Sequence, residues 1–170
     1  MAFIVYALGL LQIMFVYLCS NVLCKCVRLS GNENLHDLTT NNGLNFALRI
    51  ELTDNFGLSL YADYEYFAVQ DEGSKYLLTL GLPMNTSDSF GKCNGMMFST
   101  IDNDNDPLTS ANCAQINSGG WWYWGCSFCK LMAGYGPNYS SLRRISWRTW
   151  PRSNVYFGYA AMMLRRNVSG

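Results

Sequence analysis

The residues of this chain that could do chemistry are concentrated between positions 102 and 126. Cys113 and Cys126 stand thirteen positions apart and bracket a Gly-Gly pair and a run of four aromatic residues, Trp-Trp-Tyr-Trp. Just upstream, residues 102–106 read Asp-Asn-Asp-Asn-Asp, an oxygen-rich loop. A short covalent loop, a cation site and large flat side chains are typical of an extracellular recognition surface rather than of an acid–base active site.

The cysteine spacing favours a disulfide between Cys113 and Cys126. Closing a loop of this length stabilises a fold by about 3 kcal/mol. The alternatives are two free thiols, or zinc bound through Cys126 and Cys129, but one CxxC motif without a second pair or histidines is a weak zinc pattern. Cys93 and Cys129 could also pair with each other.

The acidic loop predicts a calcium site. Asp102, Asp104 and Asp106 present carboxylates at alternate positions. Ca²⁺ takes six to eight oxygens, which a turning loop can supply from side chains and backbone carbonyls. An EF-hand is excluded, because Pro107 replaces the required glycine and Cys113 stands where the closing glutamate belongs. A solvated acidic turn is the alternative.

The four aromatic residues divide into core and surface. We expect Trp121 and Trp122 in the core, and Tyr123 and Trp124 exposed, where their faces could stack on the C–H surface of a ligand. Enzymatic chemistry is not expected, since His36 is the sole histidine and has no placed Ser or Cys partner.

The elements that must position these residues follow from periodicity. Residues Phe46–Leu52 alternate apolar and other residues, as a half-buried strand does. Ser59–Val69 and Tyr76–Leu80 also read as strands, and we expect the three to form an antiparallel meander. Gly31–Thr39 could hold one short helix, and Asn154–Leu164 is again strand-like. Beyond Gly81 the regular patterns give way to Gly, Asn, Ser and Asp, so the predicted class is α+β with a loop-rich lobe.

The N-terminal segment and the charge distribution bear on location and partners. Residues 1–24 carry no charge and predict a cleaved signal peptide or a signal anchor, with a wrongly joined gene start as the third reading. Together with the sequons at Asn85, Asn138 and Asn167, such an N-terminal segment favours an oxidising compartment.

The charges of the chain are unevenly distributed. All twelve carboxylates lie at or before Asp106, and seven Lys or Arg follow with no acid. The two halves either neutralise each other or leave a basic face for an anionic glycan or an acidic partner. We expect no nucleic-acid partner, and a membrane contact only if the N-terminal segment is retained.

Ordered motifs from Leu29 almost to the C-terminus add a family resemblance. Leu29–Thr39 is similar to W-L-G-N-D-N-I-H-x-L-T, Leu48–Leu52 to L-R-I-D-L, Tyr61–Tyr64 to Y-A-x-Y, Cys93–Asp106 to H-N-G-M-x-F-S-T-x-D-x-D-N-D, and Ile145–Trp150 to I-x-W-x-x-W. The chain therefore resembles the fibrinogen-related C-terminal domain shared by fibrinogen chains, ficolins, tachylectins, angiopoietins and tenascins. The resemblance implies a partial domain over residues 29–170, because the family's first segment, with a Cys pair and G-G-W-T, is replaced by the leader.

The resemblance also implies roles for individual residues. The family loop binds one calcium ion, which here gives Asp104 and Asp106 as side-chain ligands and Leu108 with Ser110 or Ala111 as carbonyl donors. The peptide bond before the second cysteine, Gly125–Cys126, tends to be cis in related domains. His36 is a structural residue. The implied ligand-binding positions are Tyr123, Trp124, Ser127, Lys130 and Tyr135.

The implied ligand pocket differs from the family pattern C-H-x-S-N-L-N-G-x-Y. Ser127 replaces the histidine, and Lys130 and Met132 replace the asparagines. A ligand anchored by that histidine loses a hydrogen bond, at a cost of about 1–3 kcal/mol.

The sequence thus predicts a secreted, extracellular, non-enzymatic recognition module that is stabilised by calcium and binds acetylated glycans or a protein partner. The alternatives are a signalling or matrix ligand that acts by protein contact without sugar binding, and a truncated, degenerate copy.

Overall fold

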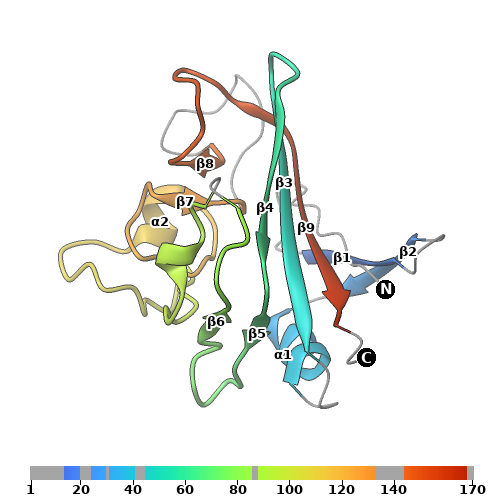
Figure 1. Ribbon diagram of the computed structural model, residues 1–170. Helices are drawn as coiled ribbons and strands as arrows, with labels where there is room; N and C mark the ends of the chain where they lie inside the picture. Colours follow the sequence, from blue (N-terminus) through green and yellow to red (C-terminus); the bar gives the residue numbers. More distant parts are fainter. Residues whose placement is uncertain are drawn as a thin grey trace.

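A long three-stranded antiparallel sheet forms the centre of the molecule, in the order β4-β3-β9 (Figure 1). The computed structural model describes residues 14–19, 24–29, 31–40, 45–85, 88–132 and 144–167. The strands of this central sheet are β3 (Phe46–Asp54), β4 (Ser59–Tyr64) and β9 (Phe157–Arg166). Few helices and several small antiparallel pairs surround this sheet, which confirms the α+β class.

Strand β3 is buried through the residues that its alternation predicts. Phe46, Leu48, Ile50 and Leu52 are each at most 2% exposed. Ile50 lies opposite Ala62 of β4 and opposite Met162 of β9, so both neighbouring strands cover it. Central strands of this kind gain their stability from cross-strand side-chain pairs.

The turn after β3 is held by the carboxylate of Asp54. The Asp54 Oδ1 atom accepts hydrogen bonds from the N–H groups of Phe56 (2.9 Å) and Leu58 (3.0 Å), and Gly57 adopts the positive φ (81°) that the turn requires. Trp150 Nε1 donates to Asp54 Oδ2 at 3.2 Å, which ties the turn to the C-terminal half. Burial opposes ionisation of Asp54, yet these hydrogen bonds hold its pKa below the ordinary value.

The predicted meander is wrong in its third strand. The segment expected to be one strand over residues 59–69 breaks after Tyr64, and β5 (Phe67–Val69) pairs instead with β6 (Leu78–Leu80) as a separate hairpin. Lys75 and Tyr76 both have positive φ, so the second strand of that hairpin begins at Leu78. The third strand of the central sheet is β9, which a sequence pattern cannot assign because the pairing spans about a hundred residues.

Helix α1 (Asn32–Thr40) forms where a short helix was predicted. Its buried residues are Leu35 and Thr39, and the Thr39 hydroxyl accepts from the N–H of Val69 at 3.2 Å. The His36 Nδ1 atom lies 2.9 Å from the Val69 carbonyl oxygen, so the sole histidine joins α1 to β5 as a structural residue.

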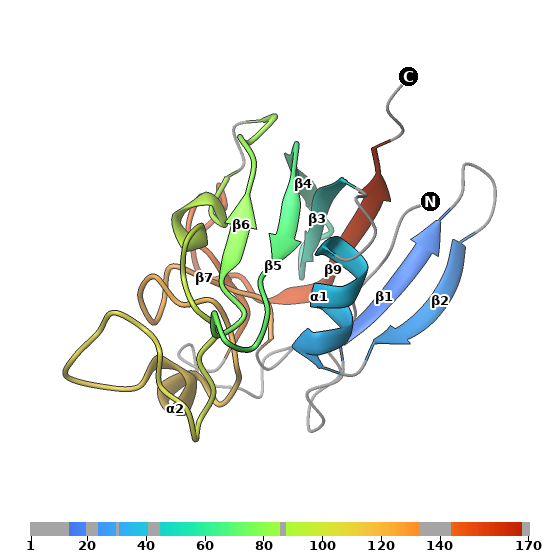
Figure 2. The ribbon, with the colours of Figure 1, turned by 90° about the horizontal axis from the view of Figure 1, so that it is seen from below.

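A hairpin of β1 (Met14–Cys19) and β2 (Cys24–Leu29) lies beside β9. Figure 2 shows α1 between β5 and this hairpin, and both views place the hairpin on the opposite side of the molecule from the lobe that carries α2. The signal peptide or anchor expected over residues 1–24 stays a prediction. Within the described ranges, the structure offers no helix with the length and apolar character needed to span a membrane.

The loop-rich lobe contains η1 (Gly91–Cys93), α2 (Cys113–Asn117) and the strand β7 (Cys129–Lys130), which pairs with β8 (Ser146–Trp147). An aromatic cluster joins this lobe to the β5–β6 hairpin. The ring of Phe90 lies 5.2 Å from Trp121, which lies 5.4 Å from Trp122, and Phe67 of β5 meets Trp122 edge to face at 6.4 Å. These large buried rings hold irregular backbone that has little regular secondary structure of its own.

Candidate recognition site

Helix α2 and one disulfide define the start of the candidate site. Asn112 caps the helix, since its side-chain oxygen accepts from the N–H of Gln115 at 3.0 Å. Cys113 in the first turn is bonded to Cys126, with 4.7 Å between their Cα atoms. The predicted disulfide is confirmed, and free thiols or zinc are excluded for these two cysteines.

The Gly-Gly pair after α2 allows close approach of three segments. A Cβ atom on Gly119 would lie 2.2 Å from the carbonyl oxygen of Met132, and one on Gly120 would lie 2.8 Å from the Phe98 ring. The backbone of Ser99 bonds to Trp121 in both directions, at 3.0 and 3.1 Å. The aromatic run is therefore anchored at its first residue.

Three of the four aromatic residues are buried. Trp121 and Trp122 lie in the core as predicted, but the predicted exposure of Tyr123 is wrong, because its side chain is 0% exposed. Its hydroxyl donates to the Gly119 carbonyl at 2.6 Å, and burial raises the pKa of Tyr123. Trp124 is 47% exposed, as expected, and meets Phe128 edge to face at 5.3 Å.

Lys130 is buried, contrary to its predicted place on the ligand-binding surface. It is 1% exposed, and its Nζ atom donates to Asn117 Oδ1. Asn117 in turn donates to the Cys126 carbonyl at 2.7 Å, so a buried chain of hydrogen bonds links β7, α2 and the disulfide. Burial lowers the pKa of Lys130 to about 8. Lysine is rarely buried completely, and nothing in the sequence around Lys130 indicates that this lysine is buried.

The other predicted ligand residues have mixed outcomes. Ser127, three positions after Trp124, is exposed, whereas Tyr135 lies outside the described residues. Only Trp124 and Ser127 of the predicted set are thus seen on the surface.

The described residues contain no cis peptide bond, so Gly125–Cys126 is trans, unlike the expectation. A non-proline cis bond persists only where its surroundings enforce it, and this bond lies between two partly exposed residues.

The acidic loop brings two predicted calcium ligands together. Asp106 Oδ2 accepts from the N–H of Cys113 (2.8 Å) and its Oδ1 from Leu108 (2.9 Å), while Asp104 Oδ1 accepts from the N–H of Asp106 (3.2 Å). Burial and the neighbouring Asp104 raise the pKa of Asp106, although the two N–H groups on it act the other way. A divalent cation would relieve this juxtaposition of carboxyls.

The calcium site predicted for this loop, with two carboxylates and backbone carbonyls as ligands, stays a prediction. Among the residues that the structure describes, no cluster of three or more His, Cys, Asp or Glu side chains could hold a metal. Leu108 and Ser110, the predicted carbonyl donors, are exposed in the same loop. Asp102 has a different role, since it accepts from the Thr100 hydroxyl at 2.7 Å.

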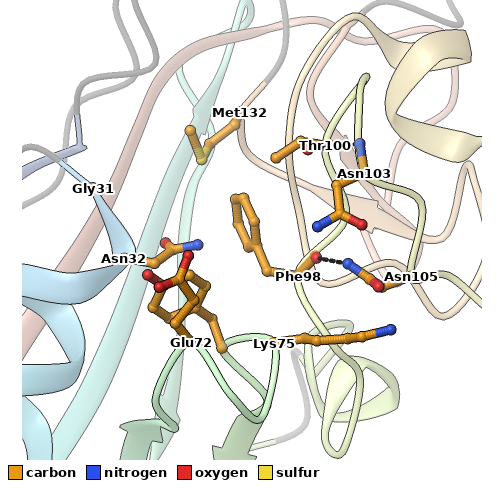
Figure 3. A pocket seen from close by; sticks show the side chains of 10 residues that line it. Gly31, Asn32, Glu72, Lys75, Phe98, Thr100, Asn103, Asn105 and Met132 are labelled. Atoms are coloured by element: carbon orange, nitrogen blue, oxygen red, sulfur yellow. Dashed lines mark hydrogen bonds between the residues drawn. The ribbon is translucent and has the colours of Figure 1, made fainter.

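A separate cavity of about 250 Å³ contains none of the predicted ligand residues. Figure 3 shows the Phe98 ring near its centre, with Asn32 and Glu72 on one side and Asn103 on the other. Lys75 and Tyr76, which both have positive φ, also line it. Sequence reasoning missed this cavity, because its walls come from segments far apart in the chain.

The remaining predicted sites lie at scattered positions. Cys93 and Cys129 are both free and buried, so the pairing allowed by the sequence is not made; burial, followed by interaction with Cys93, raises the pKa of Cys129. Of the glycosylation candidates, Asn167 is exposed and Asn85 is partly buried, donating to the Tyr61 carbonyl at 3.2 Å. Asn138 lies outside the described residues.

Comparison with known proteins gives the family. Residues 27–167 match the family described as fibrinogen beta and gamma chains, C-terminal globular domain. The chain is 41% identical over 139 residues to fibrinogen-like protein A of Apostichopus parvimensis, which covers 79% of this chain and 48% of that protein. Ryncolin-4 of Cerberus rynchops is 37% identical and tenascin of Gallus gallus 36%, each across 82% of this chain and across 41% and 8% of those proteins. The chain therefore spans about half, or less, of the length of these relatives.

Solved structures agree with the sequence comparison. The fibrinogen-like globe domain of human ANGPTL6 superposes with a TM-score of 0.67 at 28% identity, over 84% of this chain and 65% of that one. Lamprey fibrin D-dimer, complexed with the peptide Gly-His-Arg-Pro-amide, superposes with a TM-score of 0.65 at 25% identity, over 94% and 56%. The chain belongs to the family of fibrinogen-related C-terminal globular domains.

Proposed function

We propose that this chain is a secreted, extracellular and non-enzymatic recognition module, whose ligand-binding surface lies at Trp124 and Ser127. The observation that carries the proposal is the exposure of Trp124 directly after three fully buried aromatic residues. Those buried rings and the Cys113–Cys126 disulfide restrain the backbone from which the exposed ring projects. A large aromatic face that loses little freedom on binding is a frequent energetic centre of recognition surfaces.

Calcium is the proposed structural ion of this lobe. Asp104 and Asp106 would hold it with carbonyl oxygens of Leu108 and Ser110. Asp106 also accepts from the N–H of Cys113, so a change in this loop acts directly on the disulfide and α2. The ion would thus order the recognition surface rather than take part in a reaction.

A non-enzymatic role is supported by the chemistry of the titratable groups. His36 is engaged by Val69 and by the hydroxyl of Thr40, whose oxygen lies 3.0 Å from its Nδ1 atom. Among the described cysteines that are free, Cys93 and Cys129 are buried, and burial raises the pKa of Cys129. A buried thiol with a raised pKa is a poor nucleophile.

The ligand class is a glycan or a protein. The aromatic surface supports a glycan, because sugar C–H faces stack on aromatic rings. The second candidate, protein contact without a sugar pocket, is supported by Lys130, whose ammonium is used internally by Asn117. The peptide complex of lamprey fibrin shows that a fold of this kind accepts a peptide ligand.

Two binding measurements test the proposal. On an array of acetylated sugars, calcium-dependent retention that is lost in EDTA and in Trp124→Ala supports the lectin. No retention, together with cell-surface binding that Trp124→Ala abolishes, supports the protein ligand. Phe56→Ala is the matched control, since Phe56 is also an exposed aromatic residue (69%) but lies in the β3–β4 turn. The proposal is wrong if Trp124→Ala changes neither kind of binding.

A further inference from the structure

Two cations lie over the two aromatic rings of the candidate surface. Lys92 of η1 has its Nζ atom 5.7 Å from the centroid of Trp124, and Arg148, next to β8, has its Cζ atom 5.6 Å from the centroid of Phe128. The two rings themselves are 5.3 Å apart at 76°. The four side chains thus form a continuous series, Lys92–Trp124–Phe128–Arg148, which we call the cation–aromatic ridge.

A backbone hydrogen bond joins the ridge at its Arg148 end, and Lys92, at the other end, is followed directly by a buried residue. The N–H of Arg148 donates to the carbonyl of Phe128 at 3.2 Å, and Lys92 precedes the buried Cys93. The two cations therefore come from separate segments that tertiary structure brings to one surface. Lys92, Trp124 and Arg148 are exposed, and Phe128 is partly so.

The charges of the ridge are not neutralised by carboxylates. Within the described ranges, the side chains of Lys92 and Arg148 make no ion pair. Asp88, the carboxylate nearest to Lys92 along the chain, is engaged by the Tyr64 hydroxyl (2.6 Å) and by the N–H of Gly91 (2.7 Å). No Asp or Glu follows Asp106 in the sequence, so no acid next to Arg148 along the chain can neutralise it.

We propose that the cation–aromatic ridge binds an anionic saccharide, with a sugar ring stacked on Trp124 and acidic groups paired with Lys92 and Arg148. This inference rests on the proposed function, and it assigns the ligand class. Two unpaired cations favour a ligand with two or more negative groups, and planar guanidinium matches sulfate or carboxylate oxygens well. The exposed rings between them favour a sugar over an acidic peptide, because ring faces stack on C–H surfaces. A neutral acetylated sugar would leave both charges unused.

The test measures binding of a sulfated heparin hexasaccharide to the full chain at about 0.15 M salt, where charges beyond about 8 Å are screened. Lys92→Gln and Arg148→Gln should each weaken binding about five-fold, as expected for one exposed charge pair. Trp124→Leu should weaken it to a similar extent. Arg166→Gln is the matched control, because it removes the same charge from an exposed position at the far end of β9 (Figure 1), and it should change binding less than two-fold.

The other outcomes separate this inference from the proposed function. If a desulfated hexasaccharide binds as tightly as the sulfated one, the anionic class is wrong while glycan recognition stands. If polyglutamate of equal charge binds as tightly and Trp124→Leu has no effect on it, the ligand is an acidic peptide and the saccharide assignment is wrong. An equal loss in Arg166→Gln and Arg148→Gln would show a diffuse charge effect and overturn the ridge. If no sugar or cell surface is bound at all, both proposals fail.

Discussion

The buried lysine makes the sharpest prediction about this fold. Burial lowers the pKa of Lys130 from 10.5 to about 8, so the folded state disfavours its ammonium form. Above both pKa values the side chain is neutral in folded and unfolded protein, and no charge penalty applies. As the pH falls from 10.5 towards 8, the unfolded state takes up a proton before the folded state does, and stability is lost. Linkage gives a loss of about 2.5 kcal/mol between pH 10 and pH 7.

The perturbation is Lys130→Met, which keeps the length of the side chain and removes its charge. The variant also leaves Asn117 Oδ1 without a donor, at a cost of about 1–3 kcal/mol that does not depend on pH. We therefore compare the free energy of unfolding of the wild type with that of the variant, and follow their difference in denaturant titrations at pH 7, 8, 9 and 10. Other titrating groups, including Tyr123 and Cys129, cancel in this difference.

We expect the difference to rise by about 2.5 kcal/mol from pH 7 to pH 10. Lys75→Met, which removes an exposed lysine, serves as the control and should give a flat difference. A flat or falling difference for Lys130→Met would refute the reasoning, because it would mean that the ammonium is hydrated in the folded state.

Three further predictions concern the lobe. Replacing both Cys113 and Cys126 with Ala should lower the free energy of unfolding by about 3 kcal/mol in denaturant titrations, and no change would mean that the disulfide is absent from the protein. Calcium at a hundred times its Kd should stabilise the wild type by about 2.7 kcal/mol against EDTA; Asp104→Asn with Asp106→Asn should abolish this shift of Tm, and a retained shift would place the ion elsewhere. Trp122→Ala should cost about 3–5 kcal/mol, since the side chain is 0% exposed, whereas a cost below about 1 kcal/mol would contradict its place in the core.

Local patterns predicted the elements that depend on neighbouring residues. The alternation over Phe46–Leu52 predicted β3 because one face of that strand is buried. The spacing of Cys113 and Cys126 predicted a disulfide because the chain between them is short. The family motifs predicted a fibrinogen-related domain, which the match over residues 27–167 confirms, and the superposed fibrinogen-like structures confirm its fold.

Tertiary contacts decided the exposure of individual side chains. Tyr123 and Trp124 are adjacent aromatic residues with the same sequence signals, yet Tyr123 is fully buried and Trp124 is half-exposed. The Tyr123 hydroxyl donates a hydrogen bond to the Gly119 carbonyl inside the lobe. Lys130 is buried because Asn117, thirteen residues away, supplies its acceptor. The cation–aromatic ridge likewise joins segments that are distant in sequence. Residue type and order determined which groups this protein has, and long-range packing determined which of them face a ligand, since burial depends on contacts that no local pattern encodes.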